Sequence, residues 1–374
     1  MPRRWYHDQG MMMASVADSV SLTLFPFIVS VVMTALQFLR VSLLSFVTAC
    51  VAVGCIGCGR STAPSGDGGA NSGSGGSRAA VAVQLNWFPE SEHGGVYQAK
   101  SDGTYDKAEL NVEIRPGGRA TPIGPELELE RCQFAFANAD DVVLFRQQGM
   151  DVVAVLAALQ DHPRCILVRA DSGVNEFKDL VGKTFQRQNG RAYVEFMRSK
   201  GLLEGVNEVP YHGSVASLIA DPNIVVQAYS FAEPLLAQQQ GVDVRTLMVS
   251  DLGFNPYSSV LVTTGKLIRE QPELVRSFVT ATRQGWQNYL ESPERGNEAI
   301  LAANDHGMTA EALAFGAEQM KPLAMPNGMS PTEVGQMSAQ RWQTLVNQMA
   351  ELGLVDPKTV TPESCFTNEF LSGE

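Results

Sequence analysis

Residues 133–159 read QFAFANADDVVLFRQQGMDVVAVLAAL. The two ends of this stretch, Gln133–Ala137 and Val152–Leu159, are short apolar runs of the length of a strand. Between them, Ala139–Gln148 has the spacing of apolar residues that is typical of a helix burying one face. A strand, a helix and a second strand in this order are typical of a parallel sheet covered by helices, so the stretch predicts the α/β class.

The same alternation continues on both sides of this unit. Amphipathic helices are predicted at Arg191–Lys200 and Phe231–Gln240. Seven further strand candidates are Val81–Leu85, Leu110–Ile114, Cys165–Arg169, Lys183–Gln186, Ile224–Ala228, Val244–Val249 and Ser258–Thr263. After Thr264 the pattern becomes helical, with candidates at Leu274–Leu290, Arg295–Asn304, Ala310–Met320 and Thr332–Leu352. We expect two mainly parallel sheets flanked by helices, followed by a helical C-terminal tail.

The composition excludes several classes of protein. Of the 374 residues, 44% are hydrophobic and 18% are charged, which favours a large folded core over a disordered chain. The net charge of −12 repels nucleic acid. The five histidines are isolated, and the cysteines match no metal-site spacing. No hydrolase elbow or phosphate-binding loop is present. We therefore expect no nucleic acid, metal or cofactor.

The first 58 residues resemble an export leader. Val20–Leu39 carries no charge, and none follows Arg40 until Arg60. One interpretation is a pair of membrane spans, because about 20 apolar residues can cross a bilayer. We favour a signal sequence that ends in a lipobox, in which small residues precede the lipidated cysteine. Cys50 and Cys55 are the candidates for lipidation, and Cys58 has a poorer preceding sequence.

A Gly/Ser-rich segment follows the leader. Residues 61–77 read STAPSGDGGANSGSGGS, a composition that behaves as a flexible coil. We interpret residues 59–79 as a tether that holds a folded body, beginning near Val81, away from a membrane.

Polar and aromatic residues collect after the predicted strands. Ligands of open α/β sheets bind beyond the carboxyl ends of the strands. After four of the strands, the residues at that place are Asn86, Trp87 and Phe88; Asn138, Asp140 and Asp141; Gln188, Asn189 and Gly190; and Tyr229, Ser230, Phe231 and Glu233. These positions predict a binding cleft.

Residues 85–97, LNWFPESEHGGVY, resemble the opening of a family of solute-binding proteins. That family includes binders of thiamine pyrimidines, alkanesulfonates and nitrate, and the fungal thiamine-pyrimidine synthases share its fold. Further matches occur in the same order at 110–118, 134–141, 148–155, 177–183, 233–234, 257–263 and 272–278.

The resemblance implies a bilobed type II periplasmic-binding-protein fold, in which the chain crosses between lobes twice. It places lobe 1 at 80–169 and 251–374, and lobe 2 at 170–250. Together with the leader and its cysteines, it predicts an exported monomer that faces the periplasm or cell exterior on a lipid anchor. Such a protein delivers a small nutrient to an ABC permease and its ATPase.

The enzyme branch of the family is the alternative. After the third strand, the synthases carry a lysine and, four residues later, a histidine. The corresponding positions of this chain look like Ala137 and Asp141. They also carry a cysteine-rich run in place of residues 253–257 here, GFNPY. Ala137 cannot form a Schiff base with a cofactor, so we expect a binding protein and not an enzyme.

The residues of the predicted cleft suit a flat, basic ligand. Aromatic rings stack on heteroaromatic ligands, and carboxylates such as Glu233 pair with a ring nitrogen and an amine. A thiamine-pyrimidine precursor fits best, followed by riboflavin-like nutrients. Sulfonate or nitrate fits less well, although Arg191 at a helix start can hold an anion.

Structural roles compete with binding at several of these positions. Trp87 and Tyr97 could belong to the core, His93 could bond to backbone, and Asp140 or Asp141 could cap a helix. The predicted ligand-binding residues are Asn86, Trp87, His93, Tyr97, Asn138, Asp140, Asp141, Gln188, Gly190, Tyr193, Tyr229, Glu233 and Tyr257.

Overall fold

A computed structural model describes residues 78–371 of the chain. The predicted leader (1–58), its cysteines Cys50 and Cys55, and all but the last two residues of the tether lie outside the described residues, so these assignments stay predictions. Within 78–371, no helix is long and apolar enough to cross a membrane.

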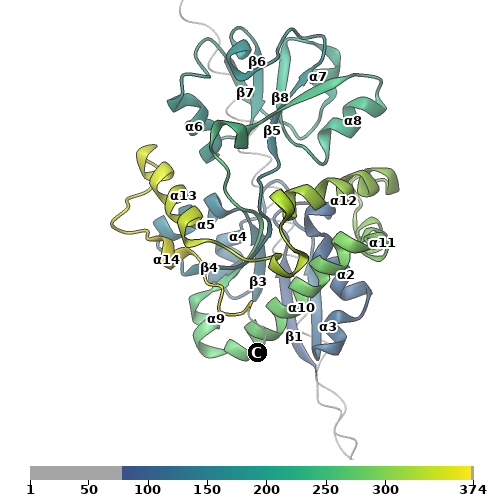
Figure 1. Ribbon diagram of the computed structural model, residues 1–374, viewed down its shortest axis with the longest axis vertical. Coiled ribbons are helices and arrows are strands. Elements are labelled where there is room, and N and C mark those ends of the chain that lie inside the picture. The colour runs from purple at the N-terminus through teal and green to yellow at the C-terminus, as the bar shows by residue number, and fades with distance from the viewer. Residues whose placement is uncertain (1–77, 372–374) are drawn as a thin grey trace, which may run out of the picture. The chain divides into compact units, whose positions relative to one another are not determined.

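The first sheet has five strands in the order β2-β1-β3-β10-β4 (Figure 1). β1, β2 and β3 pair in parallel, whereas β10 pairs antiparallel with both β3 and β4. β3 and β4 are apolar along their whole length, as is typical of strands in a sheet that helices cover on both faces. The bounds are β1 Ala79–Gln84, β2 Leu110–Arg115, β3 Phe134–Ala137, β4 Val152–Leu159 and β10 Ser258–Thr264.

The second sheet has the order β7-β6-β8-β5-β9. Here β5 is the strand that runs against its neighbours β8 and β9. The bounds are β5 Arg164–Arg169, β6 Thr184–Arg187, β7 Asn207–Pro210, β8 Ile224–Tyr229 and β9 Val244–Met248. Two α/β lobes, each with one reversed strand in an otherwise parallel sheet, confirm the predicted bilobed fold.

Two details differ from the sequence analysis. Residues 164–169 were assigned to lobe 1, but β5 hydrogen-bonds to β8 and β9, so the first crossing lies between Leu159 and Arg164. β7 was not predicted. It is a short edge strand with partly exposed polar residues and a terminal proline, and an edge strand needs no apolar pattern.

Short helices connect the strands within each lobe. In lobe 1 these are η1 Ser91–His93, α2 Gly94–Ser101, α3 Thr104–Lys107, α4 Ile123–Glu128 and α5 Ala139–Gln147. In lobe 2 they are η2 Phe177–Leu180, α6 Ala192–Ser199, α7 Ala216–Ala220, α8 Glu233–Gln239 and η3 Val249–Leu252.

The C-terminal helices pack on the first sheet, as Figure 1 shows for α10 and α12. Buried Phe278 of α10 stacks on Phe134 of β3, with ring centroids 4.2 Å apart. The helix predicted at Thr332–Leu352 begins only at Ala339, because Gly335, with φ 94°, forms a bridge to Ala157 of β4. The helices are α9 Gly265–Glu270, α10 Pro272–Glu291, α11 Glu294–Ala303, α12 Ala310–Ala324, α13 Ala339–Glu351 and α14 Pro362–Cys365, with short turns η4 Pro326–Gly328 and η5 Pro331–Glu333.

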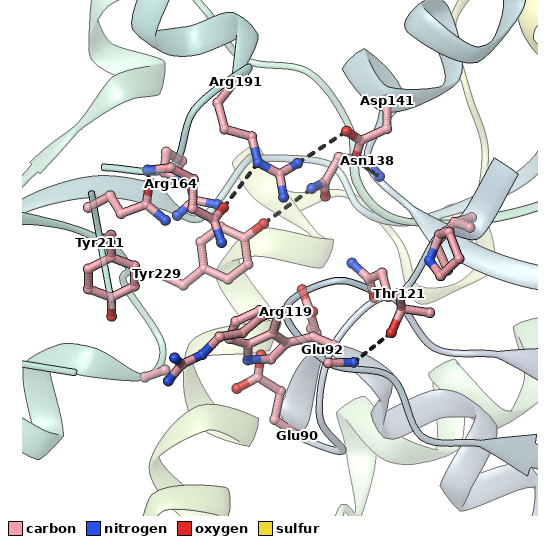
Figure 2. Close-up of a pocket in the computed structure, with 18 of the residues that line it drawn as sticks. Glu90, Glu92, Arg119, Thr121, Asn138, Asp141, Arg164, Arg191, Tyr211 and Tyr229 are labelled. Carbon is pink, nitrogen blue, oxygen red and sulfur yellow. Dashed lines mark hydrogen bonds and ion pairs between the residues drawn. The ribbon is translucent and has the colours of Figure 1, made fainter. Parts of the chain in front are cut away.

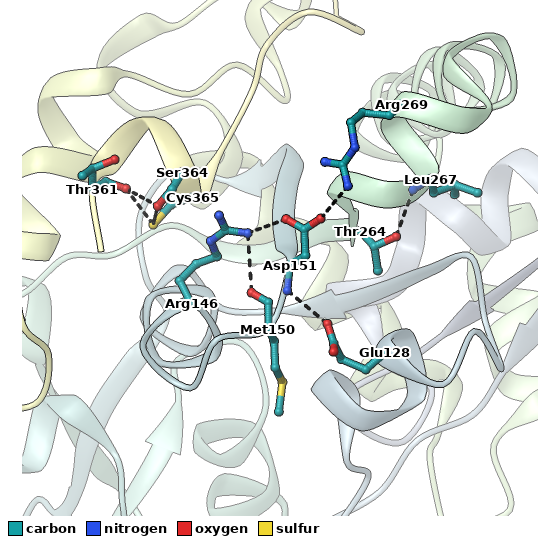
Figure 3. Close-up of polar contacts among 10 residues, drawn as sticks. All are labelled: Glu128, Arg146, Met150, Asp151, Thr264, Leu267, Arg269, Thr361, Ser364 and Cys365. Carbon is teal, nitrogen blue, oxygen red and sulfur yellow. Dashed lines mark hydrogen bonds and ion pairs between the residues drawn. The ribbon is translucent and has the colours of Figure 1, made fainter. Parts of the chain in front are cut away.

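Asp151 ties three helices to the edge of the first sheet (Figure 3). Its carboxylate accepts hydrogen bonds from Arg146 of α5 at 2.8 Å and from Arg269 of α9 at 3.3 Å. Its backbone N–H donates to Glu128 of α4 at 3.0 Å. The cluster fixes the start of β4 and so belongs to the scaffold.

A pair of glycines lets α2 approach α10 closely. A Cβ at Gly94 would overlap the Tyr289 ring, and one at Gly95 would overlap the buried Trp286 indole. Both glycines lie directly after η1, so this helix contact fixes where Glu92 and His93 sit.

We predict that Gly95→Ala lowers the free energy of unfolding by about 1–3 kcal/mol, because the added methyl overpacks the contact with Trp286. Chemical denaturation of the full chain measures this change. Lys100→Ala, at an exposed position of the same helix, is the control and should stay within about 0.5 kcal/mol of the parent. Equal stability of both variants would contradict the close packing.

Candidate functional site

A cavity of about 300 Å³ lies between the two sheets. Lobe 1 supplies the segment after β1, the loop before α4 and the start of α5. Lobe 2 supplies β5, the residues after β6, β7 and β8, and the start of α8. Figure 2 shows these side chains around the cavity. The carboxyl ends of parallel strands meet here, as expected for an open α/β sheet.

The structure brings most of the predicted site residues to this cavity. Those that line it are Asn86, Trp87, Asn138, Asp141, Gln188, Tyr229 and Glu233. Asp140 and Tyr193 line a smaller adjoining space, which they share with Arg164 and Arg191.

Four predicted residues do not line the cavity. Tyr97 is buried in the core of lobe 1, and Gly190 is an exposed turn residue with φ 72°. Tyr257 lies in the core beneath Arg341, whose guanidinium is 4.0 Å from the ring centroid. His93 is fully buried, and its Nε2 lies 2.9 Å from Oδ1 of Asn86. Burial lowers the pKa of His93 to about 3, so the ring is neutral and positions Asn86.

The sequence analysis missed several residues of the cavity wall. Glu90 and Glu92 follow β1 and lie between Trp87 and His93, which were predicted, but neither glutamate was itself predicted. Arg164 begins β5, which was assigned to the wrong lobe, and Tyr211 follows the unpredicted β7. The rule on carboxyl ends identifies Tyr211 once β7 is known. Arg164 lies at the amino end of β5, which reaches the same edge of the sheet because this strand is reversed. Arg119, Thr121 and Gln227 complete the missed polar residues.

Two polar contacts join the lobes at the cavity. Arg191 donates to Oδ1 of Asp141 at 3.1 Å, and the Asn138 amide donates to the Tyr229 hydroxyl at 3.2 Å (Figure 2). Asp141 also accepts the Asn138 backbone N–H at the start of α5, at 3.2 Å. This residue therefore takes part in the capping box of its helix and also faces lobe 2, whereas its contact with a ligand stays a prediction.

The carboxylate of Glu233 is occupied by protein groups. One oxygen accepts the Tyr229 backbone N–H at 2.7 Å, and the other accepts the Tyr211 hydroxyl at 3.1 Å. Glu233 thus holds two aromatic residues of the cavity wall in place.

Glu92 is buried but incompletely bonded. Its side chain is 1% exposed, and Oε2 has no hydrogen-bond partner in the structure described. Burial raises the pKa of Glu92 to about 7, since an ionised carboxylate loses its hydration there, and Glu233 raises it further while Arg164 opposes the shift. Burial and the neighbouring Glu92 also raise the pKa of Glu90. Both carboxyl groups of this wall therefore bind a proton at a higher pH than exposed carboxyl groups do.

Arg164 lies opposite these acids as a cation held by aromatic rings. Its guanidinium lies 4.1 Å from the centroid of Tyr229 and 5.3 Å from that of Tyr193. Its backbone N–H donates to Nδ1 of His162 at 3.0 Å, so Nδ1 carries no proton. Burial and the nearby arginines hold the pKa of His162 well below its usual value, which keeps that acceptor available.

We predict that Glu92→Gln stabilises the ligand-free protein more at pH 8 than at pH 6. The folded state holds the Glu92 proton more tightly than the unfolded state does, so the parent protein loses stability as pH rises through about 7. Glutamine does not titrate, and the gap between the two proteins should widen by roughly 1 kcal/mol across this interval. Denaturant titrations of both full chains at the two pH values measure the gap. A constant gap would show that Glu92 is ionised throughout.

Comparisons with known proteins agree with this architecture. The riboflavin-binding protein RibY of Chloroflexus aurantiacus is 26% identical over 254 residues, which cover 64% of this chain and 70% of the relative. The formylaminopyrimidine-binding protein of Halalkalibacterium halodurans is 23% identical over 286 residues, 71% of this chain and 83% of the relative. The 4-amino-5-hydroxymethyl-2-methylpyrimidine phosphate synthase of Legionella pneumophila is 22% identical over 234 residues, 60% of this chain and 73% of the relative.

Solved structures show the same fold. The periplasmic aliphatic sulphonate-binding protein SsuA of Escherichia coli superposes with a TM-score of 0.59 at 16% identity, covering 76% of this chain and 91% of SsuA. A Candida albicans protein described as having the periplasmic-binding-protein fold gives a TM-score of 0.53 at 14% identity, covering 77% and 96% of the two chains. The NMT1/THI5-like family profile matches residues 90–296, more than half of the chain, and the chain therefore belongs to the NMT1/THI5-like family.

Proposed function

We propose that this protein is the solute-binding component of an ABC importer and captures a heteroaromatic nutrient, foremost a thiamine-pyrimidine precursor, between its lobes. The observation that carries the proposal is the interlobe cavity, whose wall contains both aromatic rings and Glu92, a buried carboxyl group with an unpartnered oxygen.

The cavity wall supplies what a flat nitrogen heterocycle needs. Trp87, Phe145, Tyr211 and Tyr229 bring aromatic surface to it. Glu92 can accept hydrogen bonds from a ring N–H and an adjacent amine, a strong charge-assisted pair. With a pKa near 7, this carboxyl group ionises readily when such a ligand arrives.

The names of the relatives favour the same ligand class. Riboflavin and formylaminopyrimidine, named for two of the binding relatives, are both heteroaromatic nutrients. The synthase relative raises the alternative of catalysis. Against that alternative, no lysine is among the residues that line the described cavity. In addition, β3 ends at Ala137, at the position that looks like the one where the synthases carry their lysine.

Binding by such a protein is a mechanical step. The lobes close on the ligand and remove it from water, and the closed form is the state that a permease recognises. The contacts of Arg191 with Asp141 and of Asn138 with Tyr229 join the lobes beside the ligand, so they stabilise this closed form. The permease and its ATPase are the partners that this function requires.

We further propose that the chain is exported and lipidated at Cys50 or Cys55, with the Gly/Ser-rich segment as its tether. A lipid anchor keeps the protein near its permease, and a flexible tether leaves the lobes free to move.

We predict that the full chain, purified in mild detergent, binds 4-amino-5-hydroxymethyl-2-methylpyrimidine in a calorimetric titration and does not bind an alkanesulfonate. Glu92→Gln should weaken pyrimidine binding about tenfold to a hundredfold, because it removes a charge-assisted hydrogen bond. Glu318→Gln, at a carboxylate that is 66% exposed, is the matched control and should bind as the parent does.

Sulfonate binding without pyrimidine binding would overturn the ligand assignment. That outcome would indicate that the arginines of the cavity hold an anion. Unchanged pyrimidine binding by Glu92→Gln would contradict the role of this carboxyl group.

We predict that the full chain expressed in bacteria fractionates with the membrane, and that the double variant Cys50→Ala, Cys55→Ala appears in the soluble fraction. The variant lacks the candidate lipidation sites and therefore the anchor. Cys58→Ala is the control and should remain at the membrane. A double variant that stays in the membrane would favour a retained apolar span.

A further inference from the structure

Arg164 is the one arginine of the cavity wall whose contacts are mainly aromatic. Within residues 78–371 it forms no ion pair, and its Nε is buried without a hydrogen-bond partner. Arg191, by contrast, already donates to Asp141 and to Gln188, each at 3.1 Å. A guanidinium offers five N–H donors in a rigid planar fork, so Arg164 keeps much of its bonding capacity unused.

Among the described residues, charged groups lie near Arg164 but none of them accepts a hydrogen bond from its Nε. Glu233 favours the charged form of Arg164. Burial raises the pKa of both Glu92 and Glu233, and the charge of Arg164 opposes that rise. Glu233 is bonded to Tyr211 and Tyr229. Leaving a buried donor without an acceptor is unfavourable, and a ligand in the cavity can supply the missing acceptor.

The charge of the cavity points to a neutral acceptor. Four carboxyl groups line it, Glu90, Glu92, Asp141 and Glu233, against the guanidinium groups of Arg119, Arg164 and Arg191. An anion beside Arg164 would raise the pKa of Glu92 further and keep this carboxyl group protonated, whereas a neutral carbonyl oxygen leaves Glu92 able to ionise and accept from an amine. On a flat ligand, a carbonyl facing Arg164 can coexist with an amine facing Glu92.

We propose that Arg164 donates hydrogen bonds to a carbonyl oxygen of the ligand while Glu92 accepts from its amine, so that the site selects heteroaromatic nutrients carrying both groups. This inference rests on the proposed function and narrows its ligand class.

The test compares two neutral ligands that differ in the acceptor. One is a 4-aminopyrimidine with an N-formylaminomethyl group at position 5, and the other carries a hydroxymethyl group there. In calorimetric titrations of the full chain, we expect the formyl compound to bind at least about tenfold more tightly. Arg164→Met keeps the apolar stem and removes the donors, and it should bind the two compounds equally.

Two further variants separate this role from a loss of folding. Arg164→Lys keeps the charge but not the fork, and it should retain part of the preference for the formyl compound. Arg131→Met, at an arginine that is 60% exposed, should keep the full preference. Thermal unfolding checks that each variant is folded. If Arg164→Met does not fold, the reduced preference of Arg164→Lys for the formyl compound becomes the test.

Equal binding of both pyrimidines by the parent chain would overturn this inference while leaving the proposed function intact. A preference that persists in Arg164→Met would overturn it as well. Sulfonate binding that is lost in Arg164→Met would assign Arg164 to an anion. Failure of the parent to bind either pyrimidine would overturn the proposed function and this inference together.

Discussion

The insertion of β10 between β3 and β4 is the constraint on which the site depends. The chain leaves the first sheet after β4, builds the second, and must return through the middle of the first. The two crossing segments are therefore tied together: the Asn255 side chain accepts the His162 backbone N–H and donates to Asp161, both at 2.8 Å. Arg164 follows directly, and Ser258, at the start of β10, donates to Asn138 at 2.7 Å. The return strand thus sets both walls of the cavity.

Desolvation governs the chemistry of that cavity. Ionised groups lose hydration when they are buried, so each is paired with another group, neutralised by a shifted pKa, or held on aromatic rings. Asp141 and Arg191 pair with each other, the raised pKa of Glu92 favours its neutral form, and Arg164 lies against the ring of Tyr229. Groups of this kind gain more from a polar ligand that excludes water than they would gain on an open surface. A cleft that closes on its ligand exploits this difference.

The strands of the core were predictable from the sequence because burial requires runs of apolar residues, which can be recognised in the sequence itself. The edge strand β7 was not, since its sequence, NEVP, is partly exposed and contains no apolar run. Nor could the sequence assign β5 to its sheet, because antiparallel pairing with β8 and β9 leaves no local mark. The same limits hold for the site. Strand ends located Asn138 and Tyr229, whereas Arg164 required the topology and Glu92 required the contact of α2 with α10.

Glu92 and Glu233 show why residue type alone cannot assign a ligand contact. Glu92 is buried and Glu233 is half-buried, and both have raised pKa values at the same cavity, yet the oxygens of Glu233 accept hydrogen bonds from Tyr211 and Tyr229. Several other buried polar atoms of the described chain also lack partners, among them the Tyr97 hydroxyl and the indole N–H of Trp286, but these residues lie in the core of lobe 1 and do not line the cavity. An unsatisfied atom marks a ligand only where a ligand can reach it. In the main cavity that criterion selects Glu92 and Arg164, an acceptor and a donor, and so predicts a ligand with both kinds of group.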